Sequence, residues 1–193
     1  MIAWKFLAPG RIAPFTSVQW SASEWLEAWS LPGTGIHACA LEDLPYWFDE
    51  ELWRVELSGS ISREERQIVA GRGRLLARVE GWPSAAAEFT RACVERTRSR
   101  AVDALQAAGR IEDADALREE RNLDRLQKAA AALAEDGSVV SGYLFDAIRR
   151  RQCPGLCAYV AANAAAVGGL RAHDRERAAQ VAWLFDRLGL EKA

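Results

Sequence analysis

The residues of this chain that are most able to do chemistry lie in one pentapeptide, Gly35-Ile36-His37-Ala38-Cys39. It contains one of the two histidines and one of the four cysteines. In an extended chain, residues i and i+2 share a face, so the His37 and Cys39 side chains would lie together. Such a pair can bind a ligand, act as base and nucleophile, or hold a metal ion. The structural alternative is a histidine hydrogen-bonded at a sheet edge beside a small buried thiol.

Aromatic and basic side chains surround this pentapeptide in the sequence. Five of the eight tryptophans lie within the first 47 residues, which predicts either a filled aromatic core or a cavity with aromatic walls. The catalytic candidates are His37 and Glu56. The ligand-binding candidates are His37, Cys39, Trp4, Trp47, Trp53, Arg54 and Arg74.

A second pair of cysteines frames the segment Cys153-Pro154-Gly155-Leu156-Cys157. Proline suits the first helical position, which would place Cys153 at the N-cap, where the helix dipole lowers a thiol pKa. The pair could provide a reactive thiol, or zinc ligands together with His37 and Cys39. Its spacing is neither that of a zinc knuckle nor that of a redox Cys-x-x-Cys motif. Buried structural cysteines are therefore the favoured interpretation.

Arginines gather in two stretches, and a phosphate-bearing ligand would suit such clusters. Glutamates are interleaved with them, which favours a solvated, ion-paired surface. The net charge is −2 and no nucleic-acid motif is present, so we expect no specific nucleic-acid binding. The arginines are Arg63, Arg66, Arg72, Arg74 and Arg78, then Arg91, Arg96, Arg98 and Arg100.

Patterning up to Trp82 predicts a small, mostly antiparallel sheet with short helices. Residues 2–7 alternate apolar and other side chains with a period of two, which is typical of a strand. Strands are also predicted at 36–39, at 52–57 and over 67–80 with a break at 71–73. Helices are predicted at 22–29, carrying Trp25 and Trp29, and at 41–48. A glycine-rich turn is expected at 31–35 and a polar loop at 59–66.

From Pro83 onward the apolar period becomes 3.6 and predicts five helices, over 83–108, 111–135, 139–151, 154–167 and 173–188. Short connections favour antiparallel packing of neighbours. We therefore predict an α+β protein, in which a tryptophan-rich sheet subdomain (1–82) precedes an α-helical subdomain (83–193) and shares one core with it.

Composition places limits on function. Half of the residues are apolar and 27% are charged, as in globular proteins. No apolar run reaches eighteen residues, and the first residues do not have the pattern of a signal peptide. We therefore expect a cytoplasmic protein with reduced cysteines and no membrane partner. Its expected partner is a small molecule or another protein, and its alanine-rich helices could also pair between chains as a homo-oligomer.

Residues 1–80 resemble an uncharacterised domain of bacterial and phage proteins. The shared elements are an opening Lys5-Phe6 strand, the Gly35-to-Cys39 motif, a short helix, a Val55-Glu56 strand and a basic strand from Val69 to Leu76. The whole chain, including its ending from Ala182 to Leu190, is also similar to uncharacterised proteins of high-GC soil bacteria. This resemblance implies no activity.

Residues 35–57 also resemble small ADP-ribosyltransferase-like domains, in which a Gly-hydrophobic-His-hydrophobic strand leads into a helix and then a Val-Glu strand. Cys39 stands where those domains have a hydroxyl, and Lys5 lies where they have an arginine-bearing first strand. The resemblance implies NAD as cofactor, with His37 contacting it and Glu56 or an arginine aiding the chemistry. Otherwise we expect no cofactor. Three hypotheses follow: a ligand- or partner-binding module around Gly35–Cys39, an NAD-using enzyme, and a structural or assembly protein.

Overall fold

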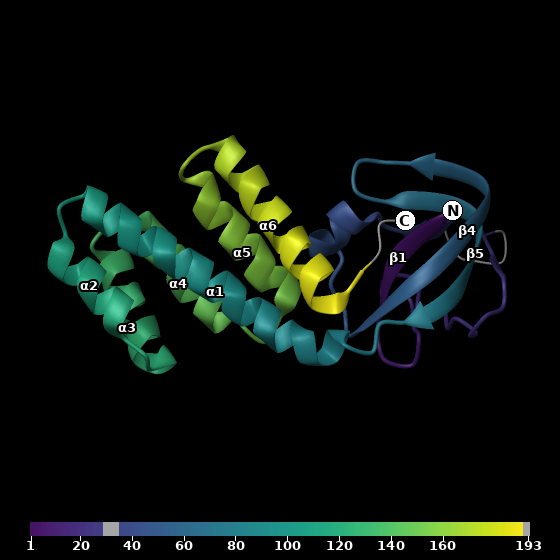
Figure 1. Ribbon diagram of the computed structural model, residues 1–193, viewed down its shortest axis with the longest axis horizontal. Coiled ribbons are helices and arrows are strands. Elements are labelled where there is room, and N and C mark those ends of the chain that lie inside the picture. The colour runs from purple at the N-terminus through teal and green to yellow at the C-terminus, as the bar shows by residue number, and fades with distance from the viewer. Residues whose placement is uncertain (29–34, 191–193) are drawn as a thin grey trace. The chain divides into compact units, whose positions relative to one another are not determined.

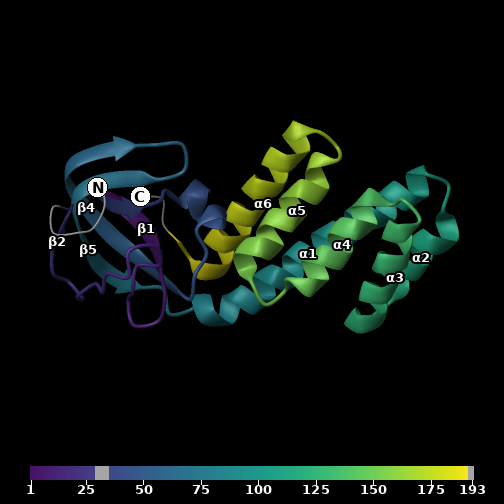
Figure 2. The same cartoon turned by 180° about the vertical axis from the view of Figure 1, so that it is seen from behind.

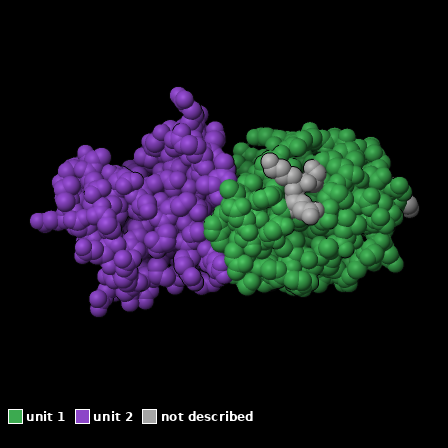
Figure 3. Space-filling model, in the orientation of Figure 1, with its two compact units in different colours: residues 1–85, 181–193 green, residues 86–180 purple. Residues whose placement is uncertain are grey.

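The computed structural model describes residues 1–28 and 35–190. They form an α+β fold, with an antiparallel sheet of five strands followed by six α-helices, and this confirms the predicted class (Figures 1 and 2). The chain divides into two compact units: unit 1 is residues 1–85 with 181–193, and unit 2 is residues 86–180 (Figure 3). The first boundary lies close to the change in composition at Trp82-Pro83. The assignment of the end of the last helix to unit 1 has no signal in the composition.

Three strands form the body of the sheet in unit 1. Strand β1 (Ile2–Leu7) pairs antiparallel with β4 (Glu51–Arg63), and β4 pairs antiparallel with β5 (Ile68–Arg78). The polar loop predicted at 59–66 is wrong in its first half, and the predicted break at 71–73 is also wrong. The strands stay paired there because Gly59 and Gly71 face each other at a bulge, where a Cβ on Gly59 would lie 3.4 Å from the Gly71 backbone.

The two shortest strands, β2 and β3, lie along the free edge of β5. Strand β3 (Ile36–Ala38) pairs with its first part, as the extended pentapeptide predicted, and β2 (Leu26–Glu27) pairs with its second part. The helix predicted at 22–29 is therefore wrong over the described residues, because Leu26 packs on the sheet core and the β5 edge supplies backbone partners. Trp29 and the turn predicted from residue 31 to 34 lie outside the described residues.

Hydrogen bonds close these strands into a ring. The Trp4 N–H donates to the Cys39 carbonyl at 2.9 Å and the Cys39 N–H donates to the Trp4 carbonyl at 2.8 Å, so β3 touches β1 as well as β5. Neighbours therefore run β1–β4–β5–β3–β1. The buried residues of the core inside this ring are Ala3, Leu7, Ala13, Trp20, Ile36, Ala38, Val55, Leu57, Ile68, Ala70 and Leu75.

Trp4 and Phe6 point to the other face of β1, where aromatic rings cluster. Phe6 packs edge-on against Phe48 and Trp82, with ring centroids 5.4 and 5.2 Å apart, and Phe48 stacks on Trp82 at 5.1 Å. Phe48 follows η2 (Leu41–Tyr46), a 3₁₀-helix that ends two residues before the end of the short helix predicted over 41–48. Pro45 has no N–H to donate and sits near the end of this turn, which limits it to a short 3₁₀ segment.

The helical region begins with α1 (Trp82–Ala107) and continues through α2 (Ile111–Glu119), α3 (Leu123–Glu135), α4 (Val139–Arg149), α5 (Pro154–Ala166) and α6 (Leu170–Leu188). Within unit 2, α4 lies beside both α3 and α5. None of the helices in the described part of the chain combines the length and apolarity that a membrane crossing requires.

The single helix predicted over 111–135 is wrong, because the chain breaks between α2 and α3. The Asn122 side chain caps α3 by accepting the N–H groups of Asp124 and Arg125, each at 3.0 Å. The Arg98 guanidinium on α1 donates to the carbonyls at the end of α2, those of Leu117, Arg118 and Glu120, at 2.6 to 2.7 Å. These bonds satisfy the backbone groups that the break leaves open.

Candidate functional site

A cavity of about 210 Å³ lies in unit 1, and its lining includes both residues of the Trp4–Cys39 bridge that joins β1 to the end of β3. Its walls come from four segments, residues 4–6, the loop residues 13–16, 18 and 20, residues 35–39, and residues 46–49. Phe15 lines it and is 84% exposed, so the cavity reaches the surface there. The structure thus brings four of the predicted ligand-binding residues to one hollow: His37, Cys39, Trp4 and Trp47.

Lys5 is the lysine among the lining residues of this cavity. It projects to the core side of β1, between Ala3 and Leu7, and burial lowers its pKa from the ordinary 10.5 to about 8. The Nζ donates to the His37 carbonyl at 2.6 Å and lies 5.2 Å from the Trp20 ring centroid. No carboxylate in the described residues pairs with it. An ammonium group has three N–H donors, so Lys5 keeps capacity for a further partner.

Trp4 supplies a second open donor. Its side chain is almost wholly buried and lines the cavity, yet its indole Nε1 has no hydrogen-bond partner in the described structure. A buried N–H without a partner costs about 1–3 kcal/mol, and the large majority of such groups are paired. Two neighbouring tryptophans do satisfy theirs: Trp47 donates to the Arg66 carbonyl at 2.6 Å and Trp82 to the Asp49 carbonyl at 2.7 Å.

His37 is held by one ring nitrogen. Its Nδ1 lies 3.0 Å from Gln67 Oε1, and the Gln67 amide donates to Glu64. The Gln67 side-chain oxygen can only accept, so Nδ1 is the donor in this contact. The described residues give Nε2 no partner, and His37 is among the residues that line the cavity.

Cys39 is a buried wall of the cavity rather than a nucleophile. It is 2% exposed, and burial, with a further contribution from Asp43, raises the pKa of its thiol well above the ordinary range. The thiol therefore stays protonated near neutral pH, whereas a reactive cysteine needs a thiolate. Of the three roles suggested by the His37–Cys39 pair, the raised thiol pKa argues against the nucleophile, and both residues are among those that line the cavity.

Two aromatic residues form the rim. Phe15 packs edge-on against Trp47 with ring centroids 6.2 Å apart. Trp47 is half-buried and comes from the segment after η2, whereas Phe15 belongs to the loop between β1 and β2. Phe15 and Trp47 thus place two aromatic rings side by side at the opening of the cavity.

The other candidates lie elsewhere in unit 1. Arg74 donates to the Glu56 carboxylate at 2.8 Å, so Glu56, the second catalytic candidate, is ion-paired. Neither residue is among those that line the cavity. Trp53 packs against the sheet core and its Nε1 donates to Glu51 at 3.0 Å. Arg54 is half-buried and also lies off the cavity wall.

The second cysteine pair belongs to unit 2. Cys157 is buried, and its sulfur lies 3.6 Å from the Thr90 carbonyl oxygen. A hydrogen bond with Cys157, together with burial, raises the pKa of the Cys93 thiol far above the ordinary range. Cys153 precedes α5 as its N-cap and is exposed. Within the described ranges, no three side chains of the His, Cys, Asp or Glu type come together as a metal site would require.

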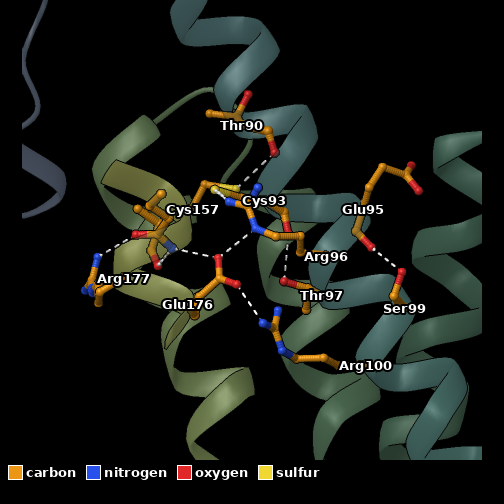
Figure 4. A network of polar contacts seen from close by, with 12 residues as sticks. Thr90, Cys93, Glu95, Arg96, Thr97, Ser99, Arg100, Cys157, Glu176 and Arg177 are labelled. Atoms are coloured by element: carbon orange, nitrogen blue, oxygen red, sulfur yellow. Dashed lines mark hydrogen bonds and ion pairs between the residues drawn. The ribbon is translucent and has the colours of Figure 1, made fainter. Parts of the chain in front are cut away.

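Unit 2 contains a separate buried polar centre, the Glu176 network (Figure 4). The Glu176 side chain on α6 is fully buried and accepts from Arg96 Nε at 2.9 Å and Arg100 Nη2 at 2.6 Å, both on α1. The Gln180 amide donates to the same carboxylate at 3.0 Å and to the Ala158 carbonyl. These arginines, counted above among a possible phosphate-binding cluster, are partners of an internal carboxylate.

Lys5 was missed as a site residue, although the sequence contains a signal for it. A lysine at the centre of a strand whose neighbours two positions away are Ala3 and Leu7 lies on a buried face. Comparisons with protein-family models, with curated proteins and with solved structures gave no match. The chemistry of the cavity is therefore argued from its own residues.

Proposed function

We propose that unit 1 is a small-ligand-binding module and that its ligand occupies the cavity between β1 and β3. This is the first of the three sequence-based hypotheses, with Lys5 added to its site. The observation that carries the proposal is a cationic side chain on a cavity wall with no carboxylate partner in the described residues. Such a charge is expensive to bury, and an incoming anion would stabilise it.

The walls indicate what kind of ligand would fit. Trp4, Phe6 and Trp20 supply apolar surface, with Phe15 and Trp47 at the rim. A ring or short apolar body would lie against them, and one carboxylate or similar acceptor would reach the Lys5 ammonium. A largely apolar pocket with a few polar groups that fix orientation is the usual form of a small-molecule site.

A matched pair of probes tests the proposal. 3-Phenylpropionate has the ring and the anion, and 3-phenylpropionamide has the same shape without the charge. We expect calorimetry to show the carboxylate binding at least about tenfold more tightly than the amide, as expected for a charge-assisted hydrogen bond. Lys5→Met removes this preference, while Lys128→Met, at an exposed lysine in unit 2, retains it. Equal binding of the two probes, or none, would exclude the proposal.

The other hypotheses remain predictions with their own measurements. If NAD is the ligand, NAD or nicotinamide should raise the melting temperature, and a His37→Ala substitution should remove the shift. If the alanine-rich helices pair between chains, light scattering should show a mass that grows with concentration.

A further inference from the structure

We propose that Lys5 is a reactive amine that forms an imine with aldehyde ligands bound in the cavity. The inference rests on the proposed ligand site and names a further ligand class for it, small aromatic or apolar aldehydes. It adds a covalent step to what the site can do.

The geometry provides an amine at the wall of an apolar hollow. The Nζ is held by a single described acceptor, the His37 carbonyl at 2.6 Å, and one such bond leaves the nitrogen free to turn toward the cavity. No acidic side chain of the described residues is paired with it to keep it protonated. Burial in an apolar site and the absence of a counter-charge are the conditions under which lysines act as nucleophiles.

The ionisation of Lys5 agrees with this role. Its pKa of about 8 leaves an appreciable neutral fraction near neutral pH. Other titratable groups on the cavity wall are His37 and Cys39 from β3, Tyr46 from η2 and Asp49 after it, while the loop residues 13–20 that line the cavity carry none. Cys39 acts on Lys5 in the opposite direction to burial, and its effect is the smaller of the two. The Asp49 carboxylate accepts from the Glu50 N–H.

The step balances without any oxidant or reductant. The neutral Lys5 amine attacks the carbonyl carbon, a C–N bond forms, and the C=O π electrons move to oxygen, which gains a proton as nitrogen loses one. The nitrogen lone pair then forms the C=N bond while the hydroxyl takes a proton and leaves as water, and the resulting iminium nitrogen gives up its second proton in return. The sum is amine plus aldehyde giving imine plus water.

Reductive trapping tests the inference. Benzaldehyde and cyanoborohydride are added to the folded full-length chain, and peptide mapping compares Lys5 with Lys128 in the same sample, with fragment ions separating Lys5 from the Met1 amine. We expect Lys5 to be labelled at least about tenfold faster near neutral pH, because a greater fraction of it is neutral. The rate should rise as pH passes about 8, and 3-phenylpropionate should slow it. Equal labelling of the two lysines would overturn the inference.

Two controls separate this inference from the ligand-binding proposal. Lys5→Arg keeps the charge but cannot form an imine, so it should bind 3-phenylpropionate and lose the label. Carboxylate affinity should fall as pH rises through about 8, opposite to the labelling rate. Carboxylate binding without preferential labelling removes the imine alone. Preferential labelling without carboxylate binding removes the anion site and supports the reactive amine.

Discussion

The two units differ in how their partly buried cationic side chains are paired. In unit 2, Arg96 and Arg100 share the fully buried Glu176, and each donates to one of its oxygens. In unit 1, Lys5 has a backbone carbonyl and an aromatic ring but no carboxylate in the described residues, and it lines a cavity. A cation matched by an internal anion holds helices in register, whereas a cation left unmatched at a cavity is a place for something that arrives from outside. The contrast identifies the ligand site more clearly than residue type alone.

The largest expected effect lies in unit 2. Glu176→Ala removes the shared anion and leaves two partly buried guanidinium groups facing each other, and we expect the free energy of unfolding to fall by about 3 kcal/mol. Urea denaturation measures it. The control is Glu95→Ala, whose carboxylate is half exposed and lies 3.7 Å from Arg98. That change should cost less than about 1 kcal/mol. Similar losses for both variants would mean that the network is not a structural centre.

The next effect tests how tightly the core of unit 1 is packed beside the cavity. A Cβ on Gly73 would lie 2.8 Å from Ile36 Cγ2 and 3.2 Å from Leu57 Cδ2. Gly73→Ala should therefore cost about 1–3 kcal/mol through overpacking, read as a lower melting temperature. Gly81→Ala, whose nearest contact would be at an ordinary 3.4 Å, is the matched control. If Gly73→Ala left the melting temperature unchanged, the core inside the ring would be loosely packed. The cavity would then not differ in packing from the rest of that core.

Lys5→Met should stabilise the free protein, in contrast to Glu176→Ala. Removing an unmatched charge from an apolar site is expected to raise the free energy of unfolding by about 1 kcal/mol. In the native protein, Lys5 has a pKa of about 8 rather than 10.5, so the unfolded chain binds more protons between these values. As pH rises through that window, the free energy of unfolding of the wild-type protein should therefore increase relative to that of Lys5→Met. A constant difference between the two proteins across the window would contradict the altered ionisation.

The smallest effect on stability is expected at the rim. Phe15 is so exposed that Phe15→Ala should change the free energy of unfolding by less than about 0.5 kcal/mol. It should nevertheless weaken 3-phenylpropionate several-fold, because one wall of the cavity mouth is lost. Leu170→Ala, at a leucine that is 82% exposed in unit 2, controls for loss of surface apolar area. Unchanged affinity after Phe15→Ala would mean that the ligand does not reach the rim.

Much of this fold could be predicted from local patterns. The alternation in residues 2–7 and the pentapeptide at 35–39 located β1 and β3, and the helical period located most helix ends. The errors occurred where a tertiary partner decided the structure. Leu26 joins the edge of β5 instead of continuing a helix, and Asn122 with Arg98 divides one predicted helix into two.

The candidate site could be predicted in part for a similar reason. His37, Cys39, Trp4 and Trp47 are close in sequence or share adjoining strands, so local reasoning grouped them. Trp53 and Arg74 were grouped by proximity in sequence, yet their side chains find partners in Glu51 and Glu56. The alternation in β1 shows that Lys5 faces the core, but its partners in the site, the His37 carbonyl and Trp20, are brought to it by the closed ring.

The ionisation of Lys5 tests the central claim most directly. The Lys5 side-chain carbon signals, assigned by their loss in Lys5→Met, can be followed by NMR through a pH titration with and without 3-phenylpropionate. We predict a pKa of about 8 in the free protein and a higher value with the carboxylate bound, because an anion stabilises the charged amine. A free-protein pKa at the ordinary lysine value, or one that the carboxylate leaves unchanged, would contradict the account.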